Sequence, residues 1–155
     1  MQKGRAFFVV GRKNWGKSDT LEALTDGSPH FRWWKIKGND FFIRRMSDDD
    51  DPRAYEKFAN DLDPESKPRV LAALCPGFVD RKQRSTLIEV FRNLKRSYEL
   101  FFFVLRNKGN NPAHIITDEE IEPFDRFGLV KVYRLEGATP EQRARALETF
   151  IKQHA

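Results

Sequence analysis

The chain has 155 residues and a formal net charge of +5, with 39% hydrophobic residues and a single cysteine. This length suits one domain with its own core, so we expect residues 1–155 to form a single domain. The lone cysteine excludes an intramolecular disulfide framework, and no apolar run approaches the roughly 18 residues that a membrane-spanning helix needs. Because no amino-terminal signal pattern is present either, we expect a cytoplasmic protein without a membrane span.

The first predicted element is a strand at 5–10, which leads directly into a glycine-containing loop. Residues 11–18 read Gly-Arg-Lys-Asn-Trp-Gly-Lys-Ser, and a helix is predicted at 17–25. A G-x-x-x-x-G-K-[ST] pattern between a strand and a helix is typical of a phosphate-binding loop. Gly11 and Gly16 would let the backbone approach phosphate oxygens closely. Lys17 would reach the β- and γ-phosphates, and Ser18 would coordinate Mg²⁺.

The rest of the chain alternates predicted strands with predicted helices. The further strands are expected at 31–37, 41–45, 69–75, 100–106 and 129–134, and the further helices at 53–61, 81–98, 118–124 and 140–153. This alternation predicts an α/β fold of three layers, with a mainly parallel sheet of about five or six strands. Gly38-Asn39-Asp40 is a turn signal between two of the strands, which form a hairpin or place one of them at an edge.

The loop resembles the Walker A motif of P-loop NTPases, and the chain is closest to small ParA/MinD-like or GTPase-like members of that superfamily. The resemblance implies that ATP or GTP binds with Mg²⁺, that Lys17 and Arg12 assist catalysis, and that Ser18 holds the metal ion. Arg12 occupies the position where ParA/MinD-like proteins carry a lysine that reaches the partner's nucleotide, which implies a homodimer. A basic loop acting within one chain stays open as the alternative. The nucleotide-binding residues implied by the motif are Gly11, Arg12, Lys13, Asn14, Trp15, Gly16, Lys17, Ser18 and Asp19.

The predicted strand at 69–75 stands where P-loop proteins carry the Walker B motif. Its ending resembles the hydrophobic-Asp-x-Pro-Gly ending of GTPases and ParA-like ATPases, but Leu74 takes the place of the aspartate. Either another carboxylate assists Mg²⁺, or hydrolysis is slow or absent. The nearest carboxylates are Asp80, Asp40 and Asp48. We interpret Asp48 to Asp51 as a solvated loop that caps the next helix, and Cys75 as a small buried residue.

The predicted strand at 100–106 is followed by Asn107-Lys108-Gly109-Asn110. This segment resembles the Asn-Lys-x-Asp motif with which GTPases read guanine, and Asn107 also resembles the strand-end asparagine that reads adenine in ParA/MinD-like proteins. An amide side chain can pair with a base edge, and Lys108 can cover the ring. Because Asn110 replaces the aspartate, we expect ATP to be preferred over GTP. A simple turn of Asn and Gly residues is the alternative.

The predicted helix at 81–98 has one apolar and one basic side. The apolar stripe is Leu87, Val90, Phe91, Leu94 and Tyr98. The cations on its flank are Arg81, Arg84, Arg92, Lys95 and Arg96. These cations predict a nucleic-acid or protein interface, lid arginines of a kinase at Arg81 and Arg84, or a solvated helix face.

Taken together, these patterns favour a nucleotide-binding protein that is a weak Mg²⁺-dependent NTPase or a nucleotide-dependent switch. Two alternatives stay open, a small-molecule kinase and an adaptor that binds nucleotide without hydrolysing it. The three histidines are scattered without metal-ligand spacing, which argues against a zinc site.

Overall fold

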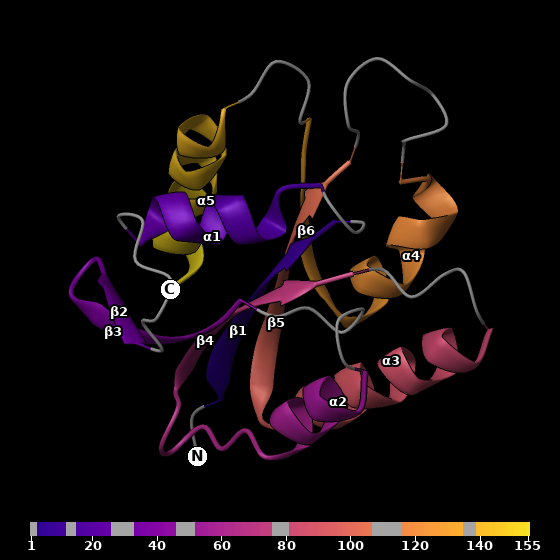
Figure 1. Ribbon diagram of the computed structural model, residues 1–155. Coiled ribbons are helices and arrows are strands. Elements are labelled where there is room, and N and C mark those ends of the chain that lie inside the picture. Colours follow the sequence, from indigo (N-terminus) through magenta and orange to yellow (C-terminus); the bar gives the residue numbers. More distant parts are fainter. Residues whose placement is uncertain are drawn as a thin grey trace.

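The computed structural model describes residues 3–11, 15–25, 33–45, 52–75, 81–106, 116–134 and 139–155. Within these residues the chain forms one six-stranded sheet in the order β2-β3-β4-β1-β5-β6 (Figure 1). The strands are β1 (Gly4–Val10), β2 (Trp33–Ile36), β3 (Asn39–Arg44), β4 (Arg69–Leu74), β5 (Tyr98–Leu105) and β6 (Gly128–Tyr133). Every neighbouring pair is parallel except β2 and β3, which form an antiparallel hairpin at one edge.

Helices cover both faces of the sheet. The helices are α1 (Lys17–Leu24), α2 (Pro52–Asn60), α3 (Arg81–Leu94), α4 (Asp118–Phe127) and α5 (Pro140–His154). Figure 1 shows α1 and α5 on one face and α2, α3 and α4 on the other. This division follows from right-handed crossovers, because the chain leaves β1 in one direction through α1 and returns in the other through α2, α3 and α4. The expected α/β fold with a mainly parallel sheet is therefore confirmed.

Consecutive phenylalanines of the strands point to opposite faces of the sheet and build an aromatic core on each face. Phe7 of β1 contacts the ring of Phe150 in α5, with centroids 6.0 Å apart. Its neighbour Phe8 points to the opposite face and contacts Phe91 of α3 at 5.9 Å. Successive strand side chains must alternate between faces, so a run of consecutive aromatics fills both cores at once. The apolar run from Ala6 to Val10 therefore suits a strand that helices cover on both faces.

Strand β1 lies at the point where the order of the sheet reverses. The loop after β1 turns to the α1 face, whereas the connections after its neighbours β4 and β5 lead to helices on the other face. In sheets of this kind, ligands bind at the carboxyl ends of the strands where the connections diverge. The fold thus places the glycine-containing loop at the favoured ligand position.

Two predicted helices differ from those observed. The helix expected at 81–98 ends at Leu94, and Tyr98 begins β5 instead of completing the apolar stripe of the helix. This tyrosine is fully buried at the start of the strand, and its hydroxyl donates a hydrogen bond to the Lys67 carbonyl oxygen (2.6 Å). The helix expected to end at residue 124 continues to Phe127 through Pro123, whose ring is buried beside Phe124. Packing outweighs the hydrogen bond that proline removes.

Among the described helices, none is long and apolar enough to cross a membrane. The remaining element bounds agree with the predicted ranges to within two residues, apart from residues that the structure does not describe. The turn between β2 and β3 confirms the hairpin interpretation. It is centred on Lys37 and Gly38, which both have positive φ, one residue earlier than expected.

Candidate functional site

The glycine-containing loop begins at the carboxyl end of β1, between the ends of its two parallel neighbours. The Gly11 amide donates a hydrogen bond to the Leu74 carbonyl oxygen at the end of β4 (3.0 Å). On the other side, Val10 is in register with Val104 of β5. The loop is therefore anchored to two strands before it turns toward α1.

Gly16 and Lys17 shape the end of the loop. Gly16 is the N-cap of α1 and has φ 85°, in the left-handed region that favours glycine. Since glycine has no side chain, the first turn of α1 is not closed off by a side-chain cap from this residue. Lys17 is only 7% exposed, and its Nζ donates to the Gly11 carbonyl oxygen (2.5 Å). Lys17, which directly follows Gly16, thus contacts Gly11 at the other end of the motif.

Arg143 of α5 supports the loop from the same face of the sheet. Its Nε donates to Thr20 Oγ1 (2.9 Å), and Thr20 Oγ1 in turn donates to the Gly16 carbonyl oxygen (2.7 Å). A Cβ at Gly16 would lie 2.7 Å from Arg143 Nη2. Arg143 is 8% exposed, so a buried guanidinium lies against the amino-terminal end of α1.

Arg45, which directly follows β3, reaches α1 from the opposite side. Its Nη2 donates to Ser18 Oγ (3.1 Å) and lies 3.4 Å from Glu22 Oε2. Its Nε is buried and has no hydrogen-bond partner among the described residues. The adjacent Arg44 points to the other face, where its guanidinium lies 4.8 Å from the centre of the Phe58 ring.

The described residues do not assemble a magnesium site around Ser18. Leu74 ends β4 next to the loop and is fully buried, so an apolar side chain lies where a P-loop NTPase would carry an aspartate. Asp40, one of the carboxylates expected to assist, lies near the start of β3, opposite Lys35. Four residues of strand separate Asp40 from Arg44 at the carboxyl end of β3, a distance of about 13 Å. That expectation is wrong for Asp40. Asp48 and Asp80 lie outside the described residues, and no group of three His, Cys, Asp or Glu side chains suited to a metal occurs within them.

The other predicted loop residues are only partly described. Trp15 is 6% exposed and belongs to the core, whereas Ser18 and Asp19 are exposed on the first turn of α1. Arg12, Lys13 and Asn14 lie outside the described residues. Their roles in nucleotide binding and catalysis stay predictions.

The predicted base-reading residues, Asn107 and Lys108, also lie outside the described residues. The residue before them, Arg106, directly follows β5 and lies at the same edge of the sheet as the glycine-containing loop. Its Nη2 is 2.8 Å from Asp118 Oδ1, and its amide donates to the Tyr133 carbonyl oxygen of β6 (3.0 Å). Base recognition therefore stays a prediction.

The basic side predicted for residues 81–98 does not lie on one helix. Arg92 is exposed on α3, but Lys95 and Arg96 belong to the turn between α3 and β5. The side chains of Arg81 and Arg84 are not described. Fourteen residues of helix span about 20 Å, so these cations are spread from the carboxyl edge of the sheet to its amino edge. Cys75, expected to be buried, is half-buried.

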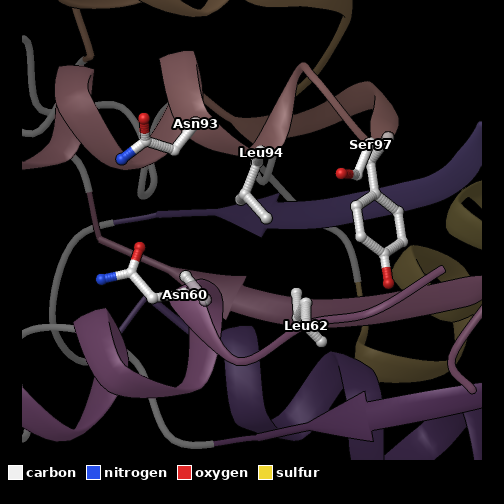
Figure 2. Close-up of a pocket in the computed structure, with 7 residues that line it drawn as sticks. Asn60, Leu62, Asn93, Leu94 and Ser97 are labelled. Atoms are coloured by element: carbon white, nitrogen blue, oxygen red, sulfur yellow. The ribbon is translucent and has the colours of Figure 1, made fainter.

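A small cavity lies at the amino-terminal edge of the sheet, away from the loop. The end of α2 and the segment from the end of α3 to the start of β5 enclose about 110 Å³ (Figure 2). The lining residues are Ala59, Asn60, Leu62, Asn93, Leu94, Ser97 and Tyr98. Pockets for small-molecule ligands are typically about 300–1,000 Å³, so this cavity is too small for a nucleotide.

Two residues of the site were not identified from the motif, although the sequence carries signals for both. Arg143 lies four residues before Leu147 on the buried stripe of a predicted helix, where an arginine is exceptional. Arg45 shares its face with Phe41 and Ile43, so strand alternation would have directed it toward α1. Both signals become informative only once the neighbouring helices are known.

Comparisons with known proteins identify no family for this chain, so its function must be argued from the site. No protein-family model matches the chain, and no curated protein sequence is significantly similar to it.

Proposed function

We propose that this protein binds a nucleoside triphosphate, ATP in preference to GTP, at the loop of residues 11–18. The observation that carries the proposal is the arrangement of this loop at the reversal point of the sheet. There Gly16 is left-handed at the start of α1, and the buried Lys17 donates a hydrogen bond to the Gly11 carbonyl oxygen. A glycine loop, a lysine and a helix amino terminus are what a phosphate chain requires.

The charges around the loop support an anionic ligand. Lys17, Arg45 and the buried Arg143 all approach the amino-terminal end of α1, which itself carries a partial positive charge. Cations at that end of a helix are unfavourable unless an anion or carboxylate lies nearby. Glu22 offsets part of this charge through Arg45. A bound polyphosphate would be attracted to the same positive end of the helix.

In this proposal, the protein binds ATP but hydrolyses it slowly. Phosphoryl transfer depends on positioning and on electrostatic stabilisation of the transferred group. Lys17 would supply the positive charge on the β- and γ-phosphates, with Arg12 as a second cation. Slow hydrolysis would make the protein a weak NTPase or a nucleotide-dependent switch.

One observation favours a second candidate, an adaptor that binds nucleotide without hydrolysing it. Leu74 fills the Walker B position with a fully buried side chain, and its carbonyl oxygen is engaged by Gly11. An aliphatic residue there can neither hold a metal ion through water nor orient an attacking water. Such an adaptor would bind ATP with no phosphate release.

The test is a titration of ATP and GTP into the wild type and into Lys17→Met, followed by measurement of phosphate release. Lys57→Met is the matched control, because Lys57 is an exposed cation on α2 whose loss changes the net charge equally. We expect Lys17→Met to weaken ATP binding by at least about tenfold, as loss of a charged hydrogen bond implies. Wild type that binds neither nucleotide at millimolar concentration would overturn the proposal, and phosphate release decides between the two candidates.

A further inference from the structure

Resting on the proposed nucleotide site, we infer that Arg45 occupies the position next to Ser18 that Mg²⁺ takes in a metal-dependent phosphate loop. The ligand of this site is then the metal-free nucleotide, with the Arg45 guanidinium on its terminal phosphates.

The Ser18 hydroxyl is already engaged by Arg45. Arg45 Nη2 donates to Ser18 Oγ at 3.1 Å, so one of the two lone pairs of this hydroxyl already accepts an N–H. A magnesium ion there would stand within a few ångströms of a guanidinium cation. The two positive charges repel each other, which disfavours a metal ion at Ser18 while Arg45 stays in place.

Arg45 is held in place by Glu22. Glu22, one turn after Ser18 on α1, lies 3.4 Å from the same Nη2, which fixes the guanidinium over the first turn of the helix. The side chain is 18% exposed, so it is substantially desolvated before any ligand arrives. A guanidinium held in this way loses little conformational entropy when it binds phosphate.

Arg45 has N–H donors beyond those in its two described contacts. Both contacts described for Arg45 use Nη2, whereas Nε is buried with no hydrogen-bond partner among the described residues. Guanidinium donors suit phosphate oxygens, which accept two of them side by side. Because Nε is buried, a terminal phosphate would meet the Arg45 guanidinium at its Nη atoms.

The carboxyl end of β4 points the same way. A metal-dependent site needs an acidic group beside the loop, and Leu74 is apolar and fully buried at that place. A cationic side chain needs no such group. The replacement of aspartate by leucine and the placement of an arginine at Ser18 are therefore complementary features of one site.

The experiment measures the dissociation constant of ATP in EDTA and in Mg²⁺ for wild type, Arg45→Met and Arg44→Met. Arg44→Met is matched in chemistry and is the preceding residue in the chain, but its guanidinium is on the opposite face of the sheet. We expect wild type and Arg44→Met to bind ATP in EDTA within about threefold of their affinity in Mg²⁺. Arg45→Met should bind at least about tenfold more weakly in EDTA, and Mg²⁺ should restore part of the loss.

Two results would overturn the inference while leaving nucleotide binding intact. One is wild type that binds ATP in Mg²⁺ but at least about tenfold more weakly in EDTA. The other is Arg45→Met that retains wild-type affinity in EDTA while urea unfolding shows it to be folded. If wild type binds ATP in neither buffer, the proposed function itself fails. Arg45→Lys adds a further check, because it keeps the charge but loses the paired donors, and we expect an intermediate affinity.

Discussion

The contact between Gly16 and Arg143 predicts a specific penalty for a side chain in the loop. Gly16→Ala puts a Cβ into left-handed backbone and 2.7 Å from Arg143 Nη2. Gly38 provides the matched control, because its φ of 78° is nearly the same and a Cβ there would meet no atom within 4 Å. The two substitutions share the backbone penalty and differ in the arginine contact.

The magnitudes follow from these two terms. Left-handed backbone costs an alanine about 1–2 kcal/mol relative to glycine, and the loss of freedom in the unfolded chain offsets part of that at both positions. To make room at Gly16, the buried Arg143 must move and weaken its hydrogen bond to Thr20. That bond contributes about 1–2 kcal/mol. We therefore expect Gly16→Ala to destabilise the protein by about 1–2 kcal/mol more than Gly38→Ala.

Urea unfolding at 25 °C measures both free energies, since a shift of the midpoint at constant slope reports stability. The same substitution is then made in an Arg143→Ala background, where the contact no longer exists. There the penalty of the alanine at residue 16 should fall to that of Gly38→Ala. Equal penalties for the two single variants, or an unchanged penalty at residue 16 without Arg143, would refute the reasoning.

Two further predictions concern the sheet away from the loop. Gly128→Ala would bring a Cβ to 2.2 Å from the Leu100 carbonyl oxygen and push β6 away from β5. Urea unfolding should therefore show that the free energy of unfolding falls by at least about 2–3 kcal/mol. A fall below about 1 kcal/mol would contradict that packing. Burial, assisted by the charge of Asp63, raises the pKa of Tyr98 well above its usual value. The unfolded chain therefore releases this proton first, and stability should fall as the pH rises above about 10. Tyr98→Phe should remove that part of the fall and cost about 1 kcal/mol at neutral pH through the lost bond to Lys67, whereas parallel stability profiles above pH 10 would argue against it.

The elements of the fold were predictable because local patterns dominate them. Consecutive apolar residues in β1 and β5 indicate buried parallel strands, and Thr139 with Pro140 marks the start of α5, where a capping box is observed. Tyr98 was misassigned because its place depends on Lys67, 31 residues away, and not on helical spacing. Spacing along one helix cannot report such a contact.

The site could be predicted only as far as one continuous segment carries it. The motif identifies Gly11, Gly16 and Lys17, which the structure joins at one end of β1. Arg45 and Arg143 come from a strand and a helix that are adjacent to α1 only after the chain has folded. Their contribution depends on tertiary packing, which no motif records.

The most direct test of nucleotide binding at this loop is an amide NMR spectrum recorded while ATP is added to the wild type. We expect the largest shift changes to fall on Gly11, Gly16 and Ser18, at the carboxyl end of β1 and the first turn of α1, and Lys17→Met to need at least about tenfold more ATP to reach them. Shift changes centred instead on Asn60 and Asn93, at the cavity on the opposite edge of the sheet, would contradict this expectation.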